Sequence, residues 1–254
     1  MNNEELDIAA LRNEFARDRI VTIDSFLDEI SAAQVEASIV ELREEFLLRV
    51  RNGTYPRTLT FHEPLSPTRG QALEDQLTVA RNRGLFTYIY YLFEPHANCS
   101  AHAVCRLTQF LASEKAVRLM ERITGDPVVK CEVAGITRYH RGHYLGAHSD
   151  RLAKFGNFQR KVAFCLYFCR NWTEAHGGLL ALAHGNRVSH QVPGFNRMVL
   201  FDVDTVGKHW VTRVEDGEAR RINMPGFFCL PIQPEAGGSH QHNPPGSSCE
   251  VNSR

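Results

Sequence analysis

The sequence predicts an α+β protein that is mainly β, with a double-stranded β-helix (jelly roll) core and N-terminal supporting helices. The second half of the chain contains six short stretches rich in β-forming residues, separated by turn residues. No helical stretch lies between them. Short strands in series are typical of a double-sheet jelly roll. The six stretches cover residues 139–145, 161–169, 177–182, 196–202, 209–214 and 220–228.

The first 128 residues are predicted to be mainly helical support for this core. Apolar residues recur there at helical spacing, as at Leu6, Leu11 and Phe15. Asp28 precedes the longest such stretch and is expected to be its N-cap. The expected elements are helices over 5–18, 28–51, 72–81, 99–113 and 114–124, and a strand over 19–27.

Residues 53–96 leave two interpretations open. The segment contains three prolines before position 70, an arginine cluster and an aromatic run over 85–93. Long insertions in compact domains are often lids or binding loops, so we interpret the segment as a lid over the mouth of the jelly roll. The alternative is that the aromatic run, which is rich in β-forming residues, is a strand of the core.

The composition is that of one globular domain with a tail. The chain has 254 residues, of which 43% are hydrophobic, and this is enough for a single packed core. We expect one domain over 1–232, in which 1–128 are the support and candidate lid and 129–232 are the jelly-roll core. Residues 233–254 are rich in Gly, Pro, Ser and His, and we expect a flexible C-terminal tail.

Charge and cysteine content argue against several classes of protein. The formal net charge is zero, whereas nucleic-acid binders usually carry a basic excess. The sequence contains no stretch of about 18 apolar residues, so it predicts no membrane-spanning helix. The first residues lack the apolar run of a secretory signal. The seven cysteines form no Cys-x-x-Cys motif, and their odd number argues against a disulfide framework. We therefore expect a reduced, cytoplasmic protein that binds neither nucleic acid nor membranes.

Three residues form a candidate metal site. His148 and Asp150 lie two positions apart on an extended segment, so their side chains point to the same side. His209 is the best-placed third ligand. Two histidines and one carboxylate form the facial set of non-haem Fe(II) oxygenases, which leaves coordination positions open. The same ligands would also suit Zn²⁺.

These residues belong to a longer ordered pattern. It resembles the 2-oxoglutarate/Fe(II)-dependent dioxygenase superfamily, and within it the prolyl 4-hydroxylase-like branch. The resemblance covers roughly residues 130–230, with weaker likeness at 20–27 and 110–125. The pattern runs Tyr139, His148-Ser-Asp150, Trp172, Gly177-Gly178-Leu, Asn196-Arg, Leu-Phe-Asp202, His209, Val214, Arg221 and Gly226-Phe.

The resemblance implies an enzyme with Fe(II), 2-oxoglutarate as co-substrate, and O2. Such an enzyme hydroxylates an unactivated C–H bond and releases succinate and CO2. The resemblance also suggests that ascorbate stimulates this activity. The family places a basic residue after the distal histidine to hold the far carboxylate of 2-oxoglutarate. Arg220 and Arg221 are both in range and point to opposite faces of the strand, so only one can serve. We prefer Arg221, with Arg220 as second choice, and the resemblance assigns Tyr139 a hydrogen bond to the same co-substrate.

The substrate is expected to be a small molecule, such as an amino acid or a biosynthetic intermediate. This expectation rests on the lid interpretation of residues 53–96. A peptidyl, prolyl-type hydroxylase that acts on a protein is the alternative, and a non-enzymatic jelly-roll binding module is a further one. The sequence leaves the identity of the substrate and the oligomeric state open, because substrate-contacting residues lie on variable loops.

Overall fold

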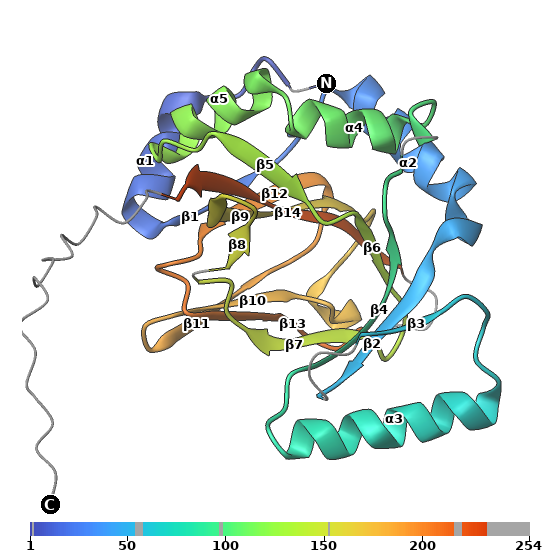
Figure 1. Cartoon of the computed structure of the whole chain (residues 1–254). Coiled ribbons are helices and arrows are strands. Elements are labelled where there is room, and N and C mark those ends of the chain that lie inside the picture. The colour runs from blue at the N-terminus through green and yellow to red at the C-terminus, as the bar shows by residue number, and fades with distance from the viewer. Residues whose placement is uncertain (2, 54–57, 97–98, 152, 216–219, 233–254) are drawn as a thin grey trace, which may run out of the picture.

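The computed structural model describes residues 1, 3–53, 58–96, 99–151, 153–215 and 220–232, which form a curved β-structure with most helices on one side (Figure 1). The helices are α1 (Ile8–Asp18), α2 (Glu29–Glu41), α3 (Pro67–Asn82), α4 (Ala103–Leu111) and α5 (Glu114–Thr124). The strands are β1 (Ile20–Ile23), β2 (Leu47–Asn52), β3 (Leu59–Phe61), β4 (Thr87–Phe93), β5 (Lys130–Val133), β6 (Ile136–Tyr139), β7 (Tyr144–His148), β8 (Lys154–Phe155), β9 (Phe158–Phe168), β10 (Leu180–His184), β11 (Arg187–Gln191), β12 (Phe195–Asp202), β13 (Lys208–Val211) and β14 (Arg221–Pro231).

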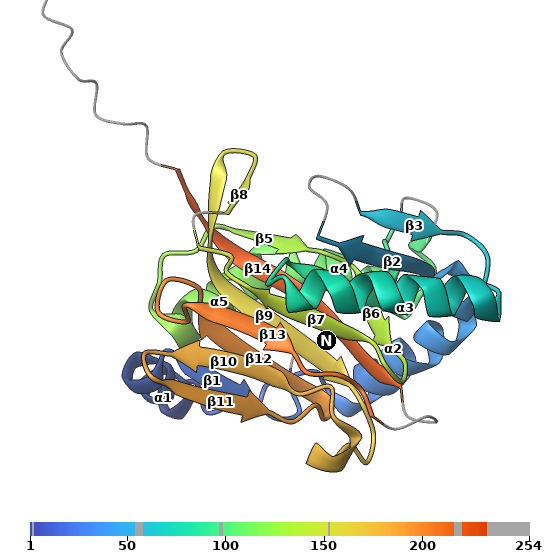
Figure 2. The same cartoon turned by 90° about the horizontal axis from the view of Figure 1, so that it is seen from below.

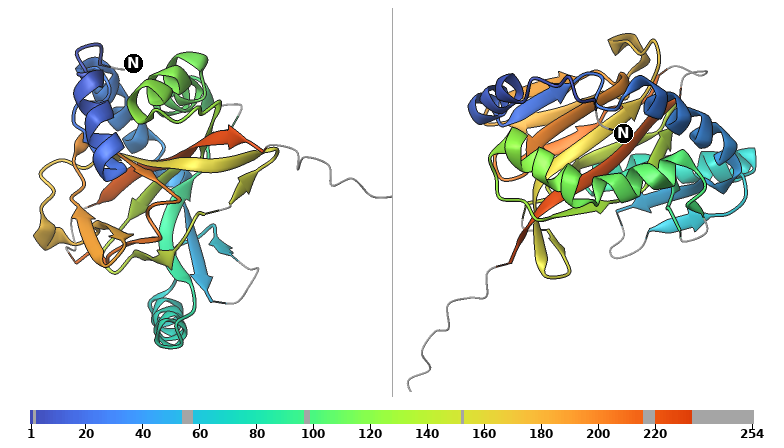
Figure 3. Two further views of the ribbon diagram at one scale, coloured as in Figure 1. Left: turned by 90° about the vertical axis from the view of Figure 1, so that its left-hand side faces the viewer. Right: turned by 90° about the horizontal axis from the view of Figure 1, so that it is seen from above.

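The strands form two facing layers. Hydrogen-bonded neighbours follow the order β1-β12-β9-β14-β6-β4-β7-β13-β10-β11. The sheet curls back on itself, so that β9, β12 and β14 face β7, β10 and β13 across the interior (Figures 1 and 3). Helices α1, α2, α4 and α5 cover the outer face of the first layer, whereas α3 lies on the other side near β2 and β4 (Figures 2 and 3). The predicted jelly-roll fold class is confirmed.

Strand β9 shows how one sequence serves both faces of the first layer. Side chains alternate across a strand. Val162, Phe164 and Leu166 belong to the large apolar cluster that includes residues of the four covering helices. Ala163 and Tyr167, which occupy the alternate positions of the strand, belong to a second cluster inside the jelly roll. The period-two pattern therefore attaches the helices on one side and lines the interior on the other.

The predicted helix over 28–51 is only partly correct. Asp28 caps it as expected, because its carboxylate accepts a 2.8 Å hydrogen bond from the Ser31 backbone N–H. However, α2 ends at Glu41, and residues 47–52 form β2, which pairs with β3 and β4. Leu48 and Val50 are buried at alternate positions in this strand. Pairing with distant strands decides between helix and strand here, since local propensity is a weak preference.

Residues 87–93 of the aromatic run form β4, so the lid interpretation is wrong for this part of the segment. Strand β4 pairs with β2, β6 and β7 and lies within the sheet. The Tyr88 and Tyr90 rings stack with centroids 4.9 Å apart. Helix α3 packs against β2 and β4. Residues 54–57 of the candidate lid lie outside the described residues, as does the predicted tail over 233–254.

The cysteines differ from expectation at one point. Cys99 and Cys105 form a disulfide at the start of α4, so the expectation that all cysteines are reduced is wrong for this pair. Cys131, Cys165 and Cys169 are free, as is Cys229. Sequence spacing alone did not reveal the pair, because a disulfide requires the two Cα atoms to approach within about 4.4–6.8 Å. Among the described residues, no helix is long and apolar enough to cross a membrane.

Asn196 joins β12 to the loop before α2. It lies in the left-handed region at φ 56°, at an irregularity in the pairing between β12 and β9. Its buried amide accepts a hydrogen bond from Leu27 N–H at 2.8 Å and donates one to Leu27 C=O at 2.7 Å. Asn196 therefore has a structural role, since it satisfies two buried backbone groups that would otherwise lack partners.

We predict that Asn196→Ala lowers the free energy of unfolding by about 2–4 kcal/mol. Each buried backbone group left without a partner costs about 1–3 kcal/mol. Urea denaturation measures the change, with Asn82→Ala in the exposed last turn of α3 as control. The control should change the free energy by no more than about 0.5 kcal/mol. An equal effect of both substitutions would contradict the assigned role.

Candidate metal and co-substrate site

Two neighbouring strands bring the predicted metal ligands together. His148 is the last residue of β7, and His209 is the second residue of β13. The strands are antiparallel, and these two residues lie directly opposite one another. Opposite residues project to the same face with their Cβ atoms about 4.5–5.5 Å apart. Asp150 follows β7 by two positions, so all three side chains point into the interior of the jelly roll.

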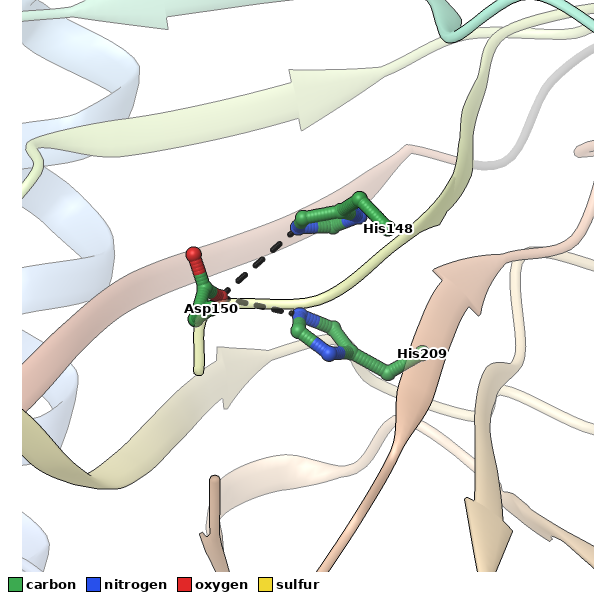
Figure 4. A group of neighbouring side chains, drawn as sticks. All are labelled: His148, Asp150 and His209. Carbon is green, nitrogen blue, oxygen red and sulfur yellow. Dashed lines mark ion pairs between the residues drawn. The ribbon is translucent and has the colours of Figure 1, made fainter. Parts of the chain in front are cut away.

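The three side chains surround one point. Asp150 Oδ2 lies 3.7 Å from His148 Nε2 and 3.2 Å from His209 Nε2. Both contacts end on the same carboxylate oxygen (Figure 4). One possible ligand atom from each residue lies within 4.8 Å of the others. The two imidazole nitrogens and the carboxylate oxygen fit Fe(II), and they could also hold Zn²⁺.

The protonation states suit a cation. His148 Nδ1 lies 3.0 Å from Gly146 C=O, which accepts a hydrogen bond from the ring and leaves the Nε2 lone pair free. Burial foremost, and then the nearby His209, lower the pKa of His148 to about 4. Burial alone would raise the pKa of Asp150, but the hydrogen bond and charge interaction with His209 outweigh it and lower this pKa. At neutral pH the site therefore presents a neutral His148 and a carboxylate.

Arg221 lies in the same cavity, which has a volume of about 100 Å³. Its side chain is completely buried at the start of β14. The guanidinium donates hydrogen bonds to Gly178 C=O at 2.6 Å, to Asn223 Oδ1, and to Tyr167 Oη at 3.5 Å. A Cβ atom at Gly178 would lie 2.9 Å from Arg221 Cδ, so a glycine permits this close approach. The Gly177-Gly178 pair thus includes a residue needed for backbone geometry.

The partners of this buried cation are all neutral. Among the ion pairs of the described residues, none involves Arg221. The guanidinium lies instead near the rings of Tyr139 and Tyr167, at 4.8 Å and 5.1 Å from their centroids. Buried charges in proteins are normally paired. A cavity lined both by a candidate metal site and by a guanidinium without an ion-pair partner among the described residues is suited to a ligand that carries a carboxylate.

Of the other two residues predicted to bind the co-substrate, Tyr139 lines the cavity and Arg220 does not. Tyr139 in β6 lies opposite Arg221 in β14 and lines the cavity. Burial raises the pKa of its phenol, so the hydroxyl stays protonated and can donate a hydrogen bond. Arg220 is exposed and does not line the cavity. The geometry therefore favours Arg221 over Arg220.

Several residues near the site were not found from the sequence. Thr137 and Asn223 line the cavity and share a 2.8 Å hydrogen bond. They lie two positions from Tyr139 and Arg221, so the alternation of side chains along a strand was a usable signal for both. Arg160 contacts Asp150 from outside the cavity and is itself bound by Glu132, and no local sequence signal indicated either residue.

The chain matches a family model described as the 2OG-Fe(II) oxygenase superfamily over residues 134–229. Two curated relatives are named prolyl 3-hydroxylase OGFOD1. The protein from Mus musculus is 32% identical over 101 residues, which are 37% of this chain and 18% of the relative. The protein from Xenopus laevis is 28% identical over 130 residues, which are 48% and 24%. This chain therefore spans about a fifth to a quarter of the length of the curated relatives it matches.

Solved structures share the fold. A prolyl-4-hydroxylase from Pseudomonas putida superimposes with a TM-score of 0.56 at 17% identity, covering 87% of this chain and 97% of that one. An oxidoreductase of the 2OG-Fe(II) oxygenase family from Burkholderia pseudomallei gives 0.54 at 13% identity, with 90% and 93% covered. At such identities the likeness shows the fold alone. Residues 134–229 are thus similar in sequence to the 2OG-Fe(II) oxygenase superfamily, and the chain shares the fold of these two solved structures.

Proposed function

We propose that this chain is a 2-oxoglutarate- and Fe(II)-dependent dioxygenase that hydroxylates a prolyl residue of a polypeptide and releases succinate and CO2. One observation carries the co-substrate assignment: the buried Arg221 guanidinium, without an anionic partner among the described residues, shares a cavity with His148, Asp150 and His209. The dicarboxylate 2-oxoglutarate can bind a metal through its keto-acid end and Arg221 through its far carboxylate. The small cavity suits a compact molecule of this kind.

Each residue has a distinct role in this proposal. His148, Asp150 and His209 would hold Fe(II), and a set of three protein ligands would leave room for the co-substrate. Arg221 binds the far carboxylate, and its planar fork offers two parallel donors for that purpose. Tyr139 donates its hydroxyl to the same co-substrate. Bound iron and 2-oxoglutarate supply the activation of O2, while these residues orient the reactants and exclude water.

The polypeptide substrate replaces the small molecule that we expected from the sequence. That expectation rested on a lid over residues 53–96, and its aromatic part is the sheet strand β4. The two curated relatives are named as prolyl 3-hydroxylases, and the likeness to them supports a prolyl substrate here. A small-molecule substrate is the competing possibility, and a jelly-roll binding module without turnover is a further one.

We predict that alanine at His148, Asp150 or His209 abolishes both iron binding and 2-oxoglutarate decarboxylation. Each substitution removes one of three ligands. Iron content and CO2 release measure the effect, and circular dichroism verifies that each variant is folded. His190→Ala is the control, because His190 lies exposed on β11. Wild-type iron content in His209→Ala would show that the third ligand is misassigned.

We predict that Arg221→Gln weakens 2-oxoglutarate binding by about 3–5 kcal/mol, because the far carboxylate would be buried without its charged partner. Arg220→Gln should have little effect, since Arg220 is exposed. Dissociation constants for 2-oxoglutarate, measured with the metal-loaded protein, compare the two variants. A large loss in Arg220→Gln alone would reverse the assignment of the two arginines.

The substrate class is tested by mass spectrometry. We expect proline-containing peptides or proteins to gain one oxygen when they are incubated with the protein, Fe(II), 2-oxoglutarate and ascorbate. Asp150→Ala is the inactive control. Oxygen gain by free amino acids but by no polypeptide would support the small-molecule alternative. Metal and 2-oxoglutarate binding without decarboxylation in the presence of any substrate would support the binding module.

A further inference from the structure

The two oxygens of Asp150 have different partners. Oδ2 faces both histidines, as Figure 4 shows, whereas Oδ1 accepts a 3.0 Å hydrogen bond from Arg160 Nη1. Arg160 does not line the cavity that contains the candidate metal site. It therefore approaches the carboxylate from behind.

We propose that Arg160 is a positioning residue that holds Asp150 so that Oδ2 alone faces the metal. This inference rests on the proposed function, since it assumes that His148, Asp150 and His209 bind Fe(II). A carboxylate that bound through both oxygens would use a second coordination position. With Oδ1 engaged by Arg160, that position stays open for co-substrate and O2. Hydrogen-bond partners of metal ligands generally fix ligand orientation in this way.

Arg160 is itself held by Glu132 and by Phe227. Glu132 in β5 accepts two hydrogen bonds from it, from Nε at 2.8 Å and from Nη2 at 2.7 Å. Its guanidinium carbon lies 3.9 Å from the centroid of the Phe227 ring. Phe227 belongs to β14, the strand between β5 and β9, and it lies opposite Glu132. The arginine thus extends from β9 across β14 to β5, and this arrangement leaves Nη1 directed at Asp150.

The charges of Glu132 and Arg160 offset one another. Glu132 and Arg160 form a close ion pair with side chains 16% and 21% exposed. Because Glu132 offsets the positive charge of Arg160, Asp150 keeps most of its attraction for a metal cation. A geometric role and a purely electrostatic role make different predictions for lysine at position 160. Lysine keeps the charge, but it lacks the planar fork that reaches Glu132 and Asp150 together.

The chain offers a matched control for this substitution. Arg170 donates two hydrogen bonds to Glu36, at 2.7 Å and 2.8 Å, and its guanidinium carbon lies 3.6 Å from the Phe195 ring centroid. This pair repeats the fork and the ring contact of Arg160, but it has no contact with Asp150. Arg170→Lys therefore removes the same local interactions at a distance from the candidate metal site.

The test is a Co(II) titration of the full-length, metal-stripped protein, followed by visible absorption of the bound ion. We expect Arg160→Lys to raise the Co(II) dissociation constant by about tenfold or more and to change the absorption spectrum. Arg170→Lys should leave the constant within about twofold of wild type. Glu132→Gln, which keeps Arg160 but loosens its support, should weaken binding by a smaller factor. Thermal melts without metal check that the variants fold, and Glu132→Gln carries the test if Arg160→Lys does not fold.

Three results would overturn the inference. Wild-type Co(II) affinity and spectrum in both Arg160→Lys and Glu132→Gln would show that the arginine does not position Asp150, while the proposed function would stand. Equal losses in Arg160→Lys and Arg170→Lys would show a general effect on stability. Failure of the wild-type protein itself to bind Co(II), Fe(II) or Mn(II) would remove the proposed function and the positioning role together.

Discussion

The antiparallel register of β7 and β13 is the constraint on which the site depends. It places His148 directly opposite His209, although they are distant in the sequence. A slip of one residue would turn one histidine to the outer face, because side chains alternate along a strand. The ladder continues through β10 on one side and through β4 on the other, so neighbouring strands hold this register in place.

The interior of the jelly roll combines an apolar wall with a small number of placed charges. Leu180, Val211 and Phe201 line the same cavity as Arg221 and the candidate metal ligands. Water is largely excluded from such a space, so a charge within it interacts strongly with any partner. The outer face of the first layer packs instead against helices, mainly through apolar side chains.

Arg160, which lies outside the cavity, and Arg221, which lines it, have different kinds of partner. Arg160 is compensated by Glu132 and supports Asp150, whereas Arg221 has only neutral partners among the described residues. The first arrangement suits the support of Asp150 from outside the cavity, and the second suits the binding of an anion. Both arginines come from long strands that lie side by side, β9 and β14. Under the proposals made above, the same pair of strands would contribute to the orientation of the metal ligand and to the recognition of the co-substrate.

The sequence by itself predicted the fold class, the cap at Asp28 and the group His148, Asp150 and His209. Alternation along a strand placed His148 and Asp150 on one side, whereas His209 was chosen from its position in the longer ordered pattern. It also limited the co-substrate cation to Arg220 or Arg221. Only the tertiary structure shows that Arg221 is buried and Arg220 exposed, since burial depends on which face of β14 meets the interior. The end of α2, the role of β4, the Cys99–Cys105 disulfide and the contact of Arg160 with Asp150 were likewise decided by tertiary structure. Each of them depends on the distance or pairing between separate segments, which local propensity and spacing do not specify.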